Sequence, residues 1–153
     1  MQSRITVQKI TNDEIAMRKA LGLREEVFVE EQKVDREEEF DEFEEESRHF
    51  VALDESGEAV GVARWRHTNS GIKLERFAVR HDWRGKGVGT VLVGSVLEDI
   101  ERTVKSTARL YLHAQLDAVP LYSKFGFHKK GEQFLECDIW HYEMEREAFS
   151  DDR

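Results

Sequence analysis

Residues 84–89 read Arg84-Gly85-Lys86-Gly87-Val88-Gly89, a glycine-rich turn that lies between a strand-like run and a helix-like run. The preceding run, residues 72–79, begins with alternating apolar and charged side chains, which predicts a strand. In the following run, residues 88–102, apolar side chains recur every three or four positions, which predicts a helix. The stretch therefore predicts a strand, a tight turn and a helix in direct succession.

This turn has the properties of an anion-binding site. The first N–H groups of a helix lack partners within the helix, and the helix dipole adds partial positive charge there. Glycines let the backbone approach an anion closely, while Arg84, Lys86 and Thr90 supply two cations and a hydroxyl. Two common nucleotide motifs are excluded, because a P-loop needs Ser or Thr after its Lys and the glycines here are spaced GxGxG rather than GxGxxG. Taken alone, the turn fits either a phosphate ligand or a simple glycine-rich helix cap.

The pattern in the rest of the chain predicts one α+β domain that spans residues 1–153. The other predicted elements are a strand at 5–7, a helix from Asn12 or Asp13 through Leu21 that ends at Gly22, a second helix at about 23–32, strands at 49–53, 59–66 and 109–114, a helix at about 118–125 after Asp117, and strands at 127–134 and 139–145. The order is β-α-α-β-β-β-α-β-α-β-β, which favours a largely antiparallel sheet with a crossover helix in the middle.

Composition excludes several classes of function. The net charge of −9 argues against generic binding to nucleic-acid phosphates, and it is compatible with a cationic substrate or with simple solubility. The single cysteine, Cys137, excludes an intrachain disulfide and fits a reducing cytoplasm. No signal-peptide pattern and no membrane-length apolar run is present, so we expect a cytoplasmic protein without membrane or nucleic-acid partners. The six histidines lack the spacing of metal ligands, so no metal cofactor is expected.

Two motifs in order resemble the signatures of the GNAT acetyltransferase superfamily. The pattern Arg84-x-x-Gly87-x-Gly89 matches the superfamily's Q/R-x-x-G-x-G/A motif. Residues 115–127, QLDAVPLYSKFGF, resemble the second motif N-x-x-A-x-x-[LF]-Y-x-K-x-G-F, with Gln in place of Asn at its start. Residues 24–32 and 141–144 are similar to the small bacterial YjcF-like and ElaA-like branch. The resemblance covers nearly the whole chain and implies the GNAT fold, a mixed but mostly antiparallel sheet that is splayed between its fourth and fifth strands and flanked by helices.

The resemblance also implies a reaction and its cosubstrate. In such enzymes an acetyl group passes from acetyl-CoA to a primary amine by direct attack in a ternary complex. The strand before the turn faces the pantetheine arm, and the N–H groups of the turn hold the pyrophosphate. The residues that the resemblance assigns to acetyl-CoA are Phe77, Ala78, Val79, Arg84, Gly85, Lys86, Gly87, Val88, Gly89, Thr90 and Gln115. The acceptor is an amine-bearing small molecule or peptide that the sequence does not name, and a homodimer is one alternative for the assembly.

Two residues are the predicted catalytic groups. Tyr122 occupies the superfamily's tyrosine position, and a phenol can donate its proton to a departing thiolate because its pKa matches or exceeds that of a thiol. The alternative is that its ring packs under the sheet and its hydroxyl anchors a loop. Glu75 is the candidate base, directly or through water, but it could instead pair with Arg64 or Arg66 on the neighbouring strand. Other functions that remain open are a non-catalytic CoA-binding sensor and transfer of a different acyl group.

Two further features have competing interpretations. Residues 37–46 are nearly all acidic, with Phe40 and Phe43 interleaved, which predicts a solvated segment with two phenylalanines turned inward. The alternative is an acidic rim that attracts a cationic amine. His113 falls on a predicted central strand, where a core histidine is expected rather than a base.

Overall fold

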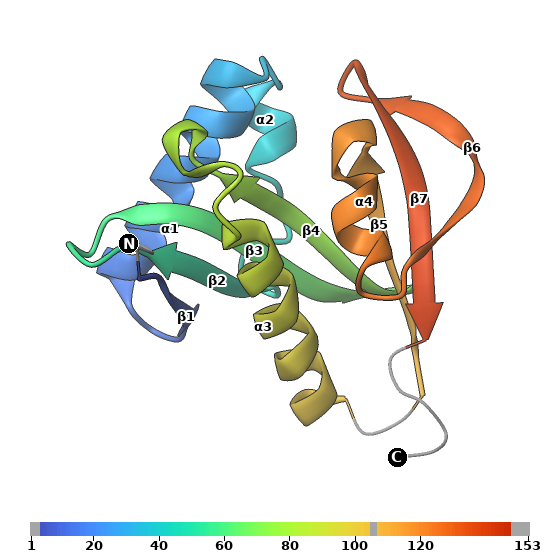
Figure 1. Ribbon diagram of the computed structural model, residues 1–153, viewed down its shortest axis with the longest axis horizontal. Helices are drawn as coiled ribbons and strands as arrows, with labels where there is room; N and C mark the ends of the chain where they lie inside the picture. The colour runs from blue at the N-terminus through green and yellow to red at the C-terminus, as the bar shows by residue number, and fades with distance from the viewer. Residues whose placement is uncertain (1–3, 105–106, 148–153) are drawn as a thin grey trace.

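The computed structural model describes residues 4–104 and 107–147. A seven-stranded sheet in the order β1-β2-β3-β4-β5-β7-β6 forms its centre (Figure 1). The strands are β1 (Thr6–Ile10), β2 (Arg48–Leu53), β3 (Ala59–Thr68), β4 (Gly71–Val79), β5 (Arg109–Gln115), β6 (His128–Glu136) and β7 (Ile139–Glu147). The helices are α1 (Glu14–Arg24), the π-helix η1 (Glu25–Glu31), α2 (Arg36–Glu39), the 3₁₀ turn η2 (His81–Trp83), α3 (Val88–Thr103), the 3₁₀ turn η3 (Leu116–Ala118) and α4 (Val119–Ser123). Neighbouring strands are antiparallel except for the parallel pair β4 and β5, so the predicted mixed α+β sheet is confirmed.

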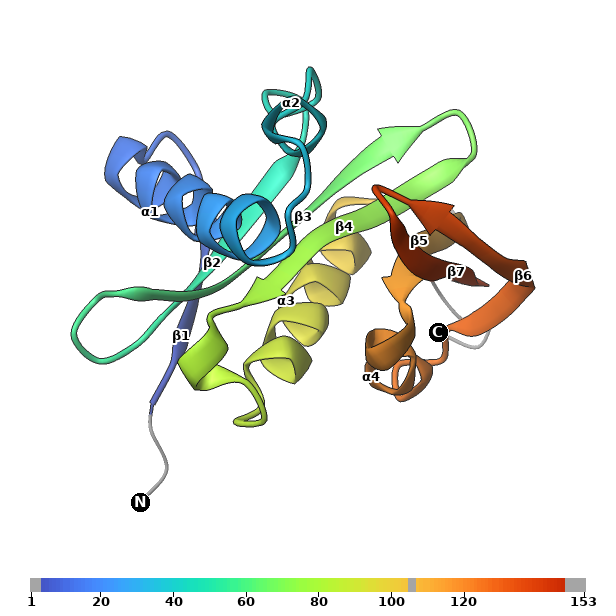
Figure 2. The same cartoon turned by 90° about the horizontal axis from the view of Figure 1, so that it is seen from above.

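Helices cover both faces of the sheet, with α1 and α2 on one side and α3 on the other (Figure 2). Strand alternation sends successive apolar side chains to opposite faces. On β2, for example, Phe50 joins the core under α3, whereas Val51 joins the core under α1. Both faces are therefore buried over the central strands. No helix among the described residues has the length and apolar character needed to span a membrane.

The sheet is splayed between β4 and β5, as predicted. These two strands form only two pairs, Ile72 with Leu110 and Lys73 with Tyr111, and then they diverge (Figure 1). Close to this point β4 carries one extra residue, because its register with β3 shifts near Arg76. Arg76 has φ +61°, in the left-handed region, as is common at a bulge. A bulge bends its strand and increases its twist, which helps β4 turn away from β5.

The predicted break at Gly22 is wrong. Asp13 caps α1 as predicted, since its side chain accepts a hydrogen bond from the backbone N–H of Ala16 at 3.0 Å. The helix then passes through Gly22 and continues directly into η1. A glycine costs a helix only about 1 kcal/mol, and the burial of neighbours such as Leu23 outweighs that cost.

Candidate active site

A cavity of about 250 Å³ opens where β4 and β5 separate. Its walls come from both strands, from η1 and α2, and from the turn between β6 and β7. Six of the predicted site residues line it, and they are Glu75, Phe77, Ala78, Arg84, Gln115 and Tyr122. The other predicted residues, Val79, Gly85, Lys86, Gly87, Val88, Gly89 and Thr90, continue from the end of β4 into the first turn of α3. The two predicted motifs therefore meet at one opening in the sheet.

The glycine turn leads from η2 into α3, with Gly87 as the N-cap residue. Gly85 and Gly87 have φ values of +76° and +88°, which cost other residues about 1–2 kcal/mol. Gly89 faces α4, where an added Cβ would approach Leu121 to 3.2 Å. These three glycines thus serve both the tight turn and the close approach of α4.

Arg84 connects the turn to η1. Its Nη atoms donate to the two carboxylate oxygens of Glu31 at 2.6 and 2.8 Å, and its Nε donates to the carbonyl oxygen of Val79 at 2.9 Å. The hydrogen bond to Glu31 raises the pKa of Arg84, so the guanidinium stays charged beside the cavity.

Tyr122 is buried in the wall of the cavity, with 6% of its surface exposed. Its ring contacts Phe77 and Phe127 edge to face, at centroid distances of 5.7 and 6.3 Å. Burial raises the pKa of the phenol above its usual value, because the charged form would lose its hydration. Its hydroxyl makes no hydrogen bond with any of the described residues. The side chain thus holds a proton and keeps a free hydrogen-bonding group at the cavity.

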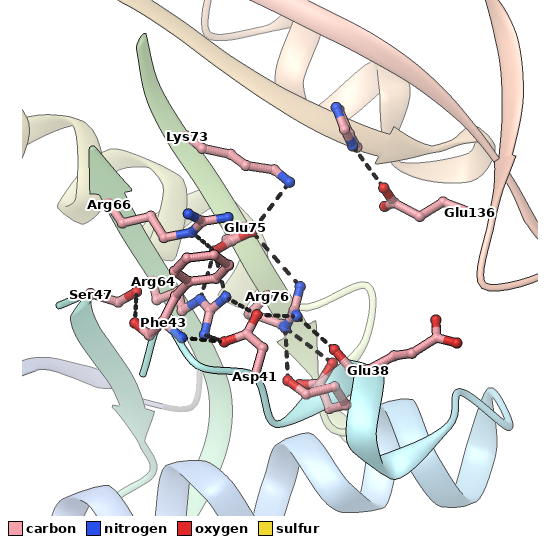
Figure 3. Close-up of polar contacts among 12 residues, drawn as sticks. Glu38, Asp41, Phe43, Ser47, Arg64, Arg66, Lys73, Glu75, Arg76 and Glu136 are labelled. Carbon is pink, nitrogen blue, oxygen red and sulfur yellow. Dashed lines mark hydrogen bonds and ion pairs between the residues drawn. The ribbon is translucent and has the colours of Figure 1, made fainter. Parts of the chain in front are cut away.

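Glu75 lies at the centre of a group of cations (Figure 3). Its carboxylate accepts from Nε of Arg64 at 2.8 Å and from Nε of Arg66 at 2.7 Å, and it pairs with Nζ of Lys73 at 3.4 Å. Burial raises the pKa of Glu75, but Arg64, Arg66 and the other neighbouring cations outweigh burial and lower the pKa to about 2. Such a carboxylate is a weak base. The contacts favour the alternative in which Glu75 pairs with the arginines of β3.

The acidic segment supplies counter-ions for this group. Asp41 accepts from both terminal nitrogens of the fully buried Arg64, at 3.0 and 2.7 Å. Arg24, also buried, pairs with Glu39 and Glu44, each at 2.7 Å. The expectation of a solvated segment is therefore wrong for these three carboxylates. Their partners lie 15 to 23 residues away in the chain, a separation that local patterning cannot reveal.

His113 and Glu136 form a pair on the other side of the opening, and the sequence did not single out this pair. Nδ1 of His113 lies 3.0 Å from Oε2 of Glu136, and both residues line the cavity. The expectation that His113 is a core histidine is wrong, because the ring is partly exposed at the cavity. Alternation along β5 could have placed His113 on the same face as Gln115. Glu136 could not have been found this way, because β6 has an irregular register with β7.

Two side-chain contacts bridge the cavity. Gln115 donates to Gln32, the C-cap residue of η1, at 2.9 Å, and the Cys137 thiol donates to Glu38 of α2 at 2.7 Å. Burial and the neighbouring Glu38 raise the pKa of Cys137 to about 12, so the side chain is a thiol and a poor nucleophile. Among the described residues, no group of three or more His, Cys, Asp or Glu side chains is arranged to hold a metal ion.

Comparisons with known proteins identify the family. The family model described as "Acetyltransferase (GNAT) domain" matches residues 6–148. The chain belongs to the GNAT acetyltransferase family. It is 39% identical over 138 residues to the uncharacterized N-acetyltransferase YjcF of Bacillus subtilis, a match that covers 88% of this chain and 95% of that protein.

Solved structures agree with the GNAT assignment. The crystal structure of Escherichia coli ElaA superposes with a TM-score of 0.82 at 26% identity, over 94% of this chain and 99% of that chain. An acyl-CoA N-acyltransferase from Pseudomonas aeruginosa superposes with a TM-score of 0.79 at 27% identity, over 95% and 99% of the two chains. The predicted fold and family are thus confirmed, and this GNAT protein is an N-acetyltransferase.

Proposed function

We propose that the chain transfers an acetyl group from acetyl-CoA to a primary amine by direct attack in a ternary complex. The observation that carries this proposal is the side chain of Tyr122, which lines the opening of the sheet and whose hydroxyl makes no hydrogen bond with the described residues. A hydroxyl that lines a cavity and is not engaged by the protein can bind a ligand there.

The donor would lie along the path formed by β4, the glycine turn and the start of α3. Backbone groups of Phe77, Ala78 and Val79 would face the pantetheine arm, and the N–H groups of residues 84–89 would hold the pyrophosphate. Thr90 and Gln115 lie beside this path, in the first turn of α3 and at the end of β5. The left-handed glycines of the turn leave its surface free of side chains toward an anion.

Tyr122 would act as the acid. The amine nitrogen attacks the carbonyl carbon of the thioester, a C–N bond forms, and the C–S bond breaks with its electron pair on sulfur. The Tyr122 hydroxyl gives its proton to that sulfur, and the proton that the new amide nitrogen loses restores the phenol. The products are an N-acetylated amine and the free thiol of CoA. The raised pKa of Tyr122 supports this role, because the phenol is protonated at neutral pH.

The acceptor must first lose the proton of its ammonium form. Glu75 was the predicted base, and its four cationic neighbours make it a weak one. We therefore propose that Glu75 holds the arginines beside the cavity in place, and that water removes the proton from the amine.

Two measurements test the proposal together. In a thermal melt, millimolar acetyl-CoA is expected to raise the melting temperature, since a ligand that binds only the folded state adds stability. In a thiol-release assay, acetyl-CoA and a panel of primary amines are expected to give free CoA. Binding without thiol release across the panel would favour the non-catalytic sensor. Faster thiol release from a longer acyl-CoA would mean that the protein transfers another acyl group instead of acetyl.

The glycine turn offers a matched pair of variants for the melt. Gly87 and Gly57 have nearly equal φ values, +88° and +86°, and neither Cβ would meet protein within 3.5 Å. Gly87→Val and Gly57→Val therefore carry a similar backbone strain, but only Gly87 lies at the proposed pyrophosphate site. Only Gly87→Val is expected to lose the shift that acetyl-CoA causes, and an unchanged shift would contradict this placement of the donor.

A further inference from the structure

The cavity has two sides that differ in chemistry, and β5 separates them. Leu112 and Ala114 point into the core that contains Tyr122, whereas His113 points to the opposite face. The register of β4 and β5 places His113 across the opening from Glu75, since each lies two residues beyond the last pair, Lys73 with Tyr111. Figure 3 shows Glu136 on the far side of the opening from Glu75. The proposed acid and Glu136 thus belong to different ends of the cavity.

Glu136 differs from the carboxylates on the opposite wall. Glu75 and Glu39 are both engaged by arginines within 3.1 Å. Glu136 has no Arg or Lys within ion-pair distance among the described residues, and its neighbours are His113 and His141. The hydrogen bond from His113 lowers the pKa of Glu136, and Lys73 adds to the effect, so the carboxylate is ionised at neutral pH. It is a negative charge in the cavity with room for a further cation.

One oxygen of the Glu136 carboxylate faces a second hydrogen-bond acceptor, a ring nitrogen of His141. The carbonyl oxygen of Ile139 lies 2.7 Å from Nδ1 of His141, and a carbonyl can only accept, so that nitrogen carries the hydrogen. In the neutral ring, Nε2 of His141 then presents a lone pair. It lies 3.9 Å from Oε1 of Glu136 and makes no hydrogen bond with the described residues, although His141 is 93% buried and lines the cavity. Two acceptor atoms thus face each other with no donor between them.

Aromatic rings and a second carboxylate surround the same place. The ring of Phe134 stacks on His141 at 5.9 Å and meets the ring of His113 edge to face at 5.0 Å. Glu38 of α2 reaches the cavity from the other wall, where its carboxylate accepts a hydrogen bond from the Cys137 thiol and forms no ion pair with an Arg or Lys among the described residues. Acceptor atoms, an aromatic face and negative charge are the surroundings that an ammonium or guanidinium group prefers.

We propose that Glu136 and His141 bind a second cationic group of the acceptor, with His113 as the positioning residue for Glu136. The reacting amine must lose the proton of its ammonium form before it attacks, and a carboxylate beside it would stabilise that protonated form. A carboxylate on the opposite face of β5 from Tyr122 instead suits a charge that the acceptor keeps throughout the reaction. The acceptor is therefore a molecule with at least two basic groups. This inference rests on the proposed acetyl transfer and names its substrate class.

Three amines of similar length test whether a second positive charge on the acceptor improves its transfer. Butane-1,4-diamine, butylamine and 4-aminobutanoate offer the same reacting amine with a positive, neutral or negative distal end. We expect kcat/KM to fall in that order. The diamine has two equivalent amines, and after division by two its kcat/KM should exceed that of butylamine by about tenfold or more, which is the contribution of a charge-assisted hydrogen bond. Equal values for the diamine and butylamine would overturn the proposal.

Glu136→Gln removes the charge and keeps the fold. The amide oxygen still accepts from His113, and the amide N–H can donate to His141, so this variant replaces the cation by a built-in donor. Its preference for the diamine over butylamine is expected to disappear, mainly through a higher KM for the diamine. Glu132→Gln makes the same charge change on the exposed part of β6 and is expected to keep the preference. A preference retained in Glu136→Gln would overturn the proposal.

The melting temperature and the shift with acetyl-CoA, measured on each variant, separate the two proposals. No acetyl-CoA shift and no thiol release in the unmodified protein would overturn both. A normal shift and normal transfer to all three probes without discrimination would overturn only the cation site. Glu136→Asp, which keeps the charge on a shorter side chain, is expected to recover part of the preference, and a complete lack of recovery would contradict the assignment of charge as the cause.

Discussion

At the scale of single residues, burial acts on two acids of the cavity in the same direction, but the outcomes differ. It raises the pKa of Tyr122 without opposition and leaves a phenol that can donate. It also raises the pKa of Glu75, but the surrounding cations reverse the shift and lower it to about 2. The neighbours of each acid, rather than its depth, therefore determine its role.

Tyr122→Phe tests whether the Tyr122 hydroxyl is the general acid. The substitution keeps the ring contacts with Phe77 and Phe127 and removes only the hydroxyl. We expect kcat to fall by about 100-fold or more, the usual contribution of a general acid, with the affinity for acetyl-CoA unchanged. Tyr111→Phe is the matched control, because its hydroxyl contacts Thr68 outside the cavity lining. An unchanged kcat in Tyr122→Phe would remove this side chain from the mechanism.

Glu75→Gln tests whether this carboxylate serves stability or proton transfer. Removing it leaves the buried Arg64 undercompensated, so we expect a loss of about 3–5 kcal/mol in the free energy of unfolding. The folded pKa of Glu75 lies below its ordinary value of 4.5, so its ionised form stabilises the fold above pH 4.5 and the contribution disappears as pH falls toward 2. Urea unfolding at pH 7 and pH 3 should therefore show a smaller difference between variant and parent at pH 3. A variant of full stability whose kcat collapses would point to the base role instead.

At the scale of elements, the sequence was informative wherever local chemistry decides. The cap at Asp13, the alternation of β4 and the glycines before α3 are local features, and the structure has the elements that they predict. The passage of α1 through Gly22 into a π-helix depends instead on packing of its apolar face against the sheet. Tertiary contacts of this kind override a glycine's low helix propensity and are not visible in a local pattern.

The turn between β6 and β7 offers a stability test. Cys137 and Asp138 connect Glu136 to its strand partner Ile139, and both have positive φ values, +51° and +60°, as in a type I′ turn. Glycine is preferred at the second position, so Asp138→Gly should raise the free energy of unfolding by about 0.5 kcal/mol and the melting temperature by about 1–2 °C. Asp138→Ala removes the same side chain but retains the cost of positive φ, so it should be the less stable of the pair. The reverse order in a thermal melt would refute this description of the turn.

At the scale of the whole molecule, the sheet has two parts joined by a short parallel contact. β1 to β4 form the first part and β5 to β7 form the second part. The two parts are joined by two backbone residue pairs, by a shared hydrophobic core and by the side-chain bridges over the cavity. The sequence predicted the opening through its resemblance to a family. It could not predict the Glu136–His113 contact, which depends on the register of strands far apart in the chain.

A ligand that lies between the two parts should hold them together. We expect acetyl-CoA to slow amide hydrogen exchange in β4, β5 and the first turn of α3, while β1 at the edge of the sheet changes little. Hydrogen exchange measured by mass spectrometry, with and without acetyl-CoA, checks this expectation. Protection that is confined to α3 would mean that the donor does not enter the opening.

The bulge at Arg76 has a genetic consequence. Deletion of this one codon would leave the pairing of β3 with β4 in register on both sides of the gap, because the bulge accounts for the whole one-residue shift. Glu75 and Phe77 would still face opposite sides, and the polypeptide could still form its sheet. The strand would lose its bend beside β5, and with it the opening that holds the cavity. A loss of three nucleotides would thus separate the capacity to fold from the capacity to catalyse, and inactive relatives that arose in this way would retain both sequence motifs, since Arg76 lies in neither.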